Sequence, residues 1–110
     1  MSNRSGYRLM WALCMFDLPV LTKPERKRAT RFRKELLELG FQMTQFSVYL
    51  RFCGSFERYK AMEKKVTALV PPHGRVHMLR LTDKQYAAAL MIDGGYRAEK
   101  LEKPDQLALF

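Results

Sequence analysis

The side chain of this sequence best placed to do chemistry is the carboxylate of Asp17, within the stretch FDLPVLTKPE. Mg²⁺ in proteins is typically held by one or two carboxylates and keeps several waters, so a single aspartate makes a weak magnesium site. Two copies of the chain could bring both Asp17 side chains to one hydrated ion, which would activate water and neutralise a phosphodiester oxygen. The alternative is structural: Asp17 accepts hydrogen bonds from N–H groups near Val20 and caps the turn, and spacing alone favours this role.

Positive charge is the second chemical signal. The chain carries 20 Lys and Arg against 11 Asp and Glu, a formal net charge of +9, which indicates a polyanionic partner if the charge is clustered. It is clustered in residues 23–34, where Lys27, Arg31 and Lys34 share one side of an expected helix. A plain solvated helix would mix signs for i,i+4 pairing, so we favour a phosphate-binding face over that alternative. The nucleic-acid-binding residues predicted here are Arg26, Lys27, Arg28, Arg31 and Lys34.

The mode of nucleic-acid contact follows from the motifs that the sequence lacks. It contains no zinc finger, no bZIP region and no RNP-type aromatic motif. We therefore expect contacts mainly to backbone phosphates, with strong salt dependence and weak base specificity.

Other residues with reactive side chains point to structural roles. Cys14 and Cys53 lie in apolar runs outside any CxxC or Cys/His cluster, so no zinc site is predicted and free thiols in a reducing cytoplasm are favoured over one bridge. His73 and His77 are isolated and are interpreted as structural. The run LMWALCMF is too short for a membrane span and lacks a signal-peptide cleavage site, so we predict a cytoplasmic protein without membrane contact.

Hydrophobic periodicity, together with capping residues, glycine and proline, assigns these residues to helices and strands. The apolar run 9–16 predicts a central strand covered on both faces. Thr22 and Glu25 form a capping box for a helix that ends at Gly40. A hairpin turning near Gln45-Phe46 follows, then a helix capped by Ser55 and stopped by Pro71-Pro72. Alternation over residues 75–81 predicts the last strong strand.

The order β-α-β-β-α-β predicts an α+β, ferredoxin-like sandwich with both helices on one face of the sheet. Residues 87–92 are expected to add a short fifth strand, which gives a domain of residues 1–96 and a tail of residues 97–110. The sheet face without helices needs a cover for its apolar residues. A homodimer would provide it by packing two sheets together, and the short strand could extend the partner's sheet.

The spaced motifs of residues 8–82 resemble those of one family. MFDLPVLTKPERKRATRFRKELLELGF followed by QFSVYLR is similar to the CRISPR-associated spacer-acquisition protein that accompanies the integrase, in its type II version. The resemblance implies ferredoxin-like homodimers in which the strand-end aspartate, here Asp17, is the Mg²⁺ ligand of a metal-dependent endonuclease acting on RNA or DNA. It also implies a dimer that bridges two integrase dimers and holds the middle of a protospacer duplex, with the nuclease activity variable.

The sequence therefore leaves two alternative functions open. One is an adaptor for CRISPR adaptation that holds duplex protospacer DNA through the basic helix. The other is a Mg²⁺-dependent endoribonuclease or endodeoxyribonuclease that uses Asp17 from both subunits.

The last five residues, QLALF, form a separate motif. They resemble the pentapeptide with which bacterial proteins dock on the DNA-polymerase sliding clamp, and a tail with Leu and Phe anchors suits such a pocket. The alternative is that the tail packs on the integrase or on the dimer. The partner-binding residues predicted in the tail are Gln106, Leu107, Leu109 and Phe110.

Overall fold

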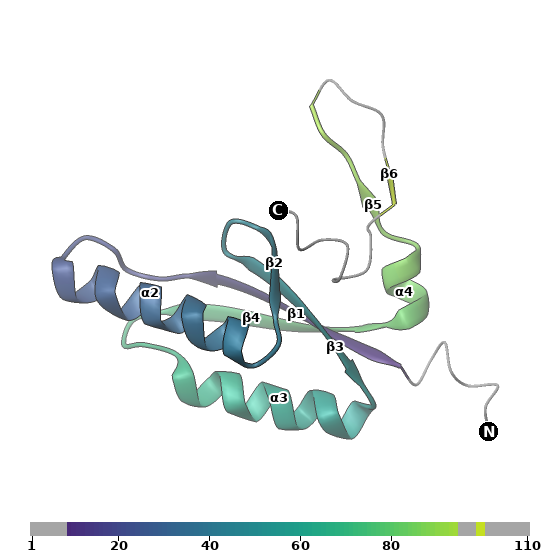
Figure 1. Cartoon of the computed structure of the whole chain (residues 1–110), viewed down its shortest axis with the longest axis horizontal. Helices are drawn as coiled ribbons and strands as arrows, with labels where there is room; N and C mark the ends of the chain where they lie inside the picture. Colours follow the sequence, from purple (N-terminus) through teal and green to yellow (C-terminus); the bar gives the residue numbers. More distant parts are fainter. Residues whose placement is uncertain (1–8, 95–98, 101–110) are drawn as a thin grey trace.

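A computed structural model describes residues 9–94 and 99–100 of the chain (Figure 1). The elements, in chain order, are β1 (Met10–Asp17), α2 (Lys23–Glu38), β2 (Gln42–Gln45), β3 (Val48–Gly54), α3 (Phe56–Leu69), β4 (Arg75–Thr82), α4 (Asp83–Ala87), β5 (Leu90–Met91) and β6 (Glu99–Lys100). The first four strands form one antiparallel sheet in the order β2-β3-β1-β4. Helices α2 and α3 pack on the same face of this sheet (Figure 1), which confirms the ferredoxin-like α+β prediction.

Strand β1 is central and apolar on both faces. Ala12, Cys14 and Phe16 alternate toward the helices and belong to the main core, while Trp11 joins a smaller cluster on the opposite face. Because successive side chains of a strand point to opposite faces, burial on both sides requires an uninterrupted apolar run. The prediction of a central strand is thus confirmed, whereas its cover on the second face is partial, since Trp11 is buried and Leu13 and Met15 are half-buried.

Helix α2 begins and ends as its local sequence requires. The Thr22 hydroxyl accepts a hydrogen bond from the Glu25 N–H at 3.2 Å, and the Glu25 carboxylate accepts from the Thr22 N–H at 2.9 Å, which completes the predicted capping box. Gly40 follows the helix with a φ of 96°, a conformation that favours glycine. Arg51 donates from Nε to the Leu39 carbonyl at 2.6 Å and closes this end.

The hairpin and the second helix also match expectation. The turn between β2 and β3 falls at Phe46 and Ser47, and the Ser55 hydroxyl caps α3 by accepting from the Arg58 N–H at 3.1 Å. Tyr59, Met62 and Val66 form the buried stripe of α3, whereas Phe56, which its spacing of three from Tyr59 would place in the same stripe, is 41% exposed. The Phe56 ring sits in the first turn, where it is covered by the guanidinium of Arg80 at 4.9 Å instead of by the core.

The chain after β4 differs from expectation. The sequence predicts a strand over residues 87–92, but Ala87 ends the short helix α4 and the strand is only Leu90–Met91, paired with Glu99–Lys100. Thr82 and Gln85 form a second capping box that starts α4. The predicted boundary between domain and tail lies at residues 95–98, outside the described residues.

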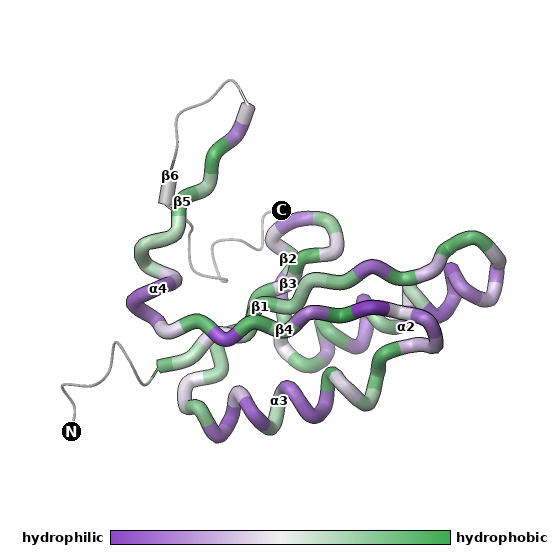
Figure 2. The backbone as a smooth tube through the Cα atoms, turned by 180° about the vertical axis from the view of Figure 1, so that it is seen from behind, coloured by the Kyte–Doolittle hydropathy of each residue, from purple (hydrophilic) through white to green (hydrophobic). Residues whose placement is uncertain are grey.

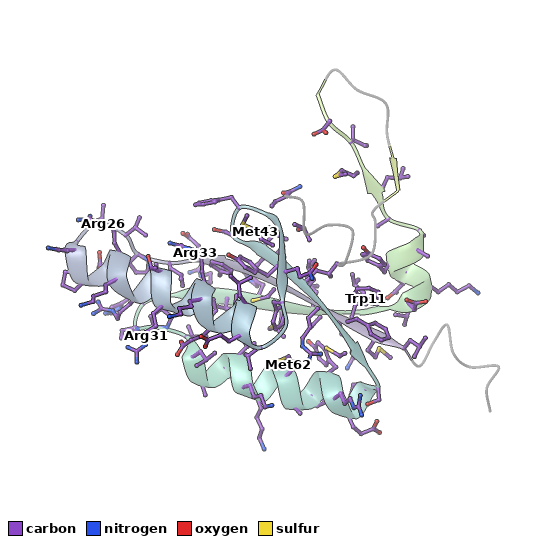
Figure 3. All side chains as sticks on the ribbon, in the orientation of Figure 1. Trp11, Arg26, Arg31, Arg33, Met43 and Met62 are labelled. Atoms are coloured by element: carbon purple, nitrogen blue, oxygen red, sulfur yellow. The ribbon has the colours of Figure 1, made fainter. Side chains whose placement is uncertain are left out.

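The sheet face opposite α2 and α3, called here the open face, is partly covered. Helix α4 closes one end, where Trp11 lies beside it (Figure 3) and stacks on Tyr86 with ring centroids 4.2 Å apart. Phe52, which lies opposite Trp11 with ring centroids 4.9 Å apart, is still 42% exposed, and Leu79, opposite Leu13, is 43% exposed. Figure 2 shows hydrophobic and hydrophilic residues in turn along β4, where Val76 and Met78 pack on the main core and Leu79 and Leu81 supply the apolar part of the open face. The residues of the open face, by alternation and register, are Trp11, Leu13, Met15, Val48, Leu50, Phe52, His77, Leu79 and Leu81.

Candidate nucleic-acid interface and acidic site

Asp17 is the last residue of β1, and its side chain is exposed. It lies opposite Arg75 in the antiparallel register of β1 and β4, and alternation along β1 puts it on the same side as the open face. Within residues 9–94 and 99–100 its carboxylate accepts no hydrogen bond and makes no ion pair. Its two oxygens therefore retain their full capacity to bind a cation or a donor.

The turn-cap role that spacing favours for Asp17 is not what the structure shows. The N–H groups of Leu21 and Thr22 both donate to Glu25 Oε1, each at 2.9 Å. Glu25 is therefore the residue that caps this turn, and these hydrogen bonds lower its pKa from the ordinary value. Asp17 is left outside the hydrogen-bond network of the turn.

The donor set around Asp17 fits only a hydrated ion. In the described part of the chain, no three His, Cys, Asp or Glu side chains gather closely enough to hold a metal. A magnesium ion at Asp17 would therefore take its remaining oxygens from water, a phosphate or a second copy of the chain, which is a coordination pattern that Mg²⁺ accepts.

The predicted basic residues lie together on α2. Lys27, Arg28, Arg31 and Lys34 are exposed, whereas Ala29, Phe32 and Leu36 are buried, as the helical spacing predicts. We call this exposed basic surface of α2 the α2 ridge. A shallow hollow of about 680 Å³ runs along it. The residues lining it are Lys23, Pro24, Arg26, Lys27, Arg28, Thr30, Arg31 and Lys34.

The α2 ridge is poorly neutralised. Among the described residues, Glu35 lies 3.8 Å from Arg31 Nε in an exposed pair that contributes little to stability, and Glu25 interacts electrostatically with Arg28. Arg26 differs from the others because its Nη1 donates to the Val20 and Leu21 carbonyls at 3.2 and 3.0 Å. Arg26 therefore holds the β1–α2 loop, whereas Lys27 and Lys34, which make no hydrogen bond or ion pair with another described residue, keep their donors for an anion.

Two sides of α2 lead to different surfaces (Figure 3). On the side of Arg31, a hollow of about 250 Å³ extends the ridge to Pro71 at the end of α3. On the side of Arg33, a hollow of about 370 Å³ opens between the loop after β1 and the β2–β3 turn, with Asp17 and Phe46 in its wall. Neither Arg33 nor Phe46 is a site residue predicted from the sequence, since no spacing signal connects three separate segments.

The cysteines and histidines, for which the sequence predicts structural roles, differ in burial. Both cysteines are buried and free, and burial raises the pKa of Cys14 to about 12 and also raises that of Cys53, so neither serves as a thiolate nucleophile near neutral pH. His73 and His77 are exposed, and His77 lies opposite Met15 on the open face.

The predictions about membrane contact and about the C-terminal tail can be compared with the structure only in part. No helix in the described part of the chain is long and apolar enough to cross a bilayer. The predicted partner-binding residues Gln106, Leu107, Leu109 and Phe110 lie outside the described residues.

Comparison with known proteins identifies what this chain resembles. The family described as "CRISPR associated protein Cas2" matches residues 10–89. A protein of Paracidovorax avenae is 52% identical over 96% of this chain and 98% of its own length. Proteins of Flavobacterium psychrophilum and Parvibaculum lavamentivorans are 42% and 45% identical over 94% and 92% of this chain, and over 90% and 100% of their own lengths. All three are named "CRISPR-associated endoribonuclease Cas2".

Proposed function

This chain belongs to the CRISPR-associated protein Cas2 family, and we propose that it acts in CRISPR adaptation as a basic homodimer. The dimer bridges integrase dimers and holds duplex protospacer DNA for spacer integration in the cytoplasm. The observation that carries this proposal is the α2 ridge, an exposed and largely unpaired row of cations on a rigid helix.

The rigidity of α2 supports a positioning role. The helix is fixed at its start by the capping box and at its end by Arg51, and Phe32 and Leu36 anchor it in the core. Because the cations stand on one fixed surface, they can contact a row of phosphates without ordering a loop. Such contacts position a duplex and are indifferent to its sequence.

The open face supports the homodimer. Phe52 and Leu79 leave over two fifths of their surface exposed, and their neighbours on the open face are also apolar. A second copy with the same apolar surface would cover these residues through a two-fold axis, as a self-complementary patch does. The same packing would bring the two Asp17 side chains, which lie on that side, toward each other.

A second function, a Mg²⁺-dependent endonuclease acting on RNA or DNA, is favoured by the unengaged carboxylate of Asp17 and by the names of the relatives. In this function Asp17 from each subunit would hold the ion. A bound magnesium ion would supply charge neutralisation at a phosphodiester oxygen and a lowered pKa for water. The guanidinium of Arg75, opposite Asp17 in the register, is placed to attract the anionic strand.

Duplex binding by the ridge is tested by charge reversal. The variant K27E/R31E/K34E should weaken duplex binding and flatten its salt dependence by about one unit of log–log slope for each phosphate that is no longer neutralised. A matched control, R58E/K64E/K65E, makes the same change of net charge on α3, where the three residues are also exposed. Equal weakening in both variants would attribute binding to net charge and contradict the role of the ridge.

Asp17 separates the two functions. Asp17→Asn preserves size and removes the charge, so cleavage should be lost while spacer acquisition persists if the protein is an adaptor. Loss of acquisition in this variant, with folding and self-association unchanged, would contradict a purely architectural role. Light scattering after size exclusion, with and without the integrase, measures the assembly in each case.

The tail motif QLALF is the basis of a separate proposal, docking on the sliding clamp. A synthetic peptide of the tail should bind purified clamp, and the same peptide with Leu107, Leu109 and Phe110 replaced by Ala should not. Failure of the native peptide to bind would leave the integrase or the dimer as the partner of the tail.

A further inference from the structure

The hollow beside Asp17, called here the turn hollow, combines chemistry that the α2 ridge lacks. Its volume of about 370 Å³ lies at the lower end of the range of roughly 300–1,000 Å³ typical of small-molecule sites. It joins three segments: the end of β1 at Asp17, helix α2 at Thr30 and Arg33, and the β2–β3 turn at Phe46 and Ser47. Phe16 and Arg26 also line it, so two aromatic rings, two guanidiniums, two hydroxyls and the Asp17 carboxylate share one small concave surface.

Phe46 is unusually exposed for a residue held in place. Its side chain is 80% exposed at the tip of the hairpin, although the turn itself is constrained. Ser47 has a φ of 64°, and its carbonyl accepts a hydrogen bond from the Phe16 N–H at 3.1 Å, which ties the turn to the end of β1. The Phe46 ring is therefore presented to solvent on a fixed turn, which is the arrangement of a stacking platform.

Arg33 supplies an available guanidinium in the same hollow. It is half-buried, and its one hydrogen bond to another described residue is a long contact of 3.4 Å from Nη2 to the Thr30 hydroxyl. Arginine has five N–H donors in a fixed fork that matches a phosphate. No carboxylate pairs with Arg33 among the described residues, so most of these donors stay available to an anion.

Part of the rim of the turn hollow is apolar: Leu18 and Val20 line it, next to the charged side chain of Arg26. Val20 and Leu21, in the loop after β1, are 50% and 88% exposed, and Figure 2 shows this loop as a hydrophobic stretch. Arg26 keeps the loop in position through the Val20 and Leu21 carbonyls. The rim thus adds apolar surface beside the ring of Phe46.

We propose that the turn hollow binds one unpaired nucleotide of a single-stranded nucleic acid, with its base on the Phe46 ring and its phosphate on Arg33. Inside a duplex both faces of each base are covered by stacking, so away from the duplex ends only an unpaired base can offer a face to Phe46. The proposal rests on the nucleic-acid binding proposed above and extends it from duplex to single strand. It also sets a phosphodiester beside the carboxylate of Asp17.

The test compares single-stranded and duplex binding by fluorescence anisotropy, using labelled oligothymidylate, oligouridylate and a blunt DNA duplex. Phe46→Ala should weaken single-strand binding by about tenfold, as removal of a stacking platform does, and leave duplex binding within about twofold. Phe46→Trp should retain single-strand affinity. Arg33→Ala should also weaken single-strand binding, and Arg33→Lys should restore part of it. Phe56→Ala is the matched control, because that ring is 41% exposed on α3.

The outcomes separate this inference from the duplex proposal. Wild-type duplex binding that depends on the α2 ridge, together with no effect of Phe46→Ala on single strands, would overturn the nucleotide site alone. Equal weakening of both ligands in Phe46→Ala would also overturn it. Unchanged nucleic-acid binding with weakened integrase assembly would assign Phe46 to a protein interface instead. As a direct readout, photo-crosslinking of 5-iodouracil strands should label the tryptic peptide of residues 35–51, and labelling elsewhere alone would contradict the site.

Discussion

The rings of Trp11 and Tyr86 stack with centroids 4.2 Å apart and planes inclined by 20°, joining the first strand to a helix near the end of the described chain. The indole N–H of Trp11 donates to Asp83 Oδ1 at 2.8 Å, so the ring contacts α4 through both its face and its edge. Helix α4 has only five residues and would not be stable alone. Its position on the open face therefore depends on Trp11.

Removal of the Tyr86 ring should destabilise the protein substantially. Tyr86 is 3% exposed, and replacement by Ala leaves a cavity against Trp11, which typically costs about 3–5 kcal/mol of unfolding free energy for an aromatic residue. Urea denaturation followed by Trp11 fluorescence measures the change. Ala87→Ser, in the exposed part of α4, is the control and should shift the midpoint little. A Tyr86→Ala loss below about 1 kcal/mol would contradict the role of the stack.

Gly40 should not tolerate a side chain. Its φ of 96° strains any L-residue, and a Cβ there would lie 2.9 Å from Arg51 Nε, the atom that donates to the Leu39 carbonyl. Gly40→Ala should therefore lower the unfolding free energy by about 1–2 kcal/mol, or more if the Arg51 hydrogen bond is broken. Gly94→Ala is the matched control, since a Cβ at that position meets nothing within 4 Å. Similar stabilities for both variants would show that Gly40 is not constrained.

Local signals account for what could be predicted from sequence. Thr22, Glu25 and Gly40 mark the ends of α2 within one element, and the apolar run of β1 identifies the central strand. The capping box at Thr82 and Gln85 carries the same kind of signal, but five residues are too few to show helical periodicity. The contact that fixes α4 joins Trp11 to Asp83, 72 residues apart, which no window along the chain can reveal.

In the candidate site, too, local patterns could be predicted from the sequence and contacts between distant segments could not. The cations of the α2 ridge lie on one helix, so their spacing predicts their common exposure. The turn hollow unites Asp17, Arg33 and Phe46 from three segments, and only the sheet order and the hairpin register bring them together. Spacing alone favours Asp17 as the cap of the β1–α2 turn, whereas the longer Glu25 side chain reaches the Leu21 and Thr22 N–H groups.

The capping carboxylate of Glu25 should make stability depend on pH. Hydrogen bonds from Thr22 lower its pKa below the ordinary value of 4.5, so the folded state binds a proton less readily than the unfolded state. The stabilisation is therefore complete above about pH 4.5 and is lost as pH falls through the folded-state pKa. Glu25→Gln should be less stable than wild type at pH 7, with the two thermal midpoints converging in acid.

Glu38→Gln is the control for that pH series. Its carboxylate accepts no hydrogen bond among the described residues, so the substitution removes a charge without removing a cap. A constant difference between Glu25→Gln and wild type from pH 7 to pH 3 would exclude a contribution from ionised Glu25.

The buried thiols should be unreactive in the folded protein. Burial raises the pKa of Cys14 to about 12 and also raises that of Cys53, so almost no thiolate is present at pH 8. A disulfide reagent such as dithionitrobenzoate should release colour only after guanidinium is added, and then at two thiols per chain. Rapid reaction of either thiol without denaturant would mean that the sheet opens more readily than its packing indicates.

Self-association through the open face should be sensitive to charge. Leu79 is 43% exposed on β4, so Leu79→Glu should fold with little strain yet place two carboxylates in the proposed dimer contact. Like charges brought together at an interface cost several kcal/mol, and we expect the dimer dissociation constant to rise by about a hundredfold or more. Phe56→Glu is the matched control, because Phe56 is 41% exposed on α3, away from that face. Light scattering across a concentration series measures both, and an unchanged dimer in Leu79→Glu would place the interface elsewhere.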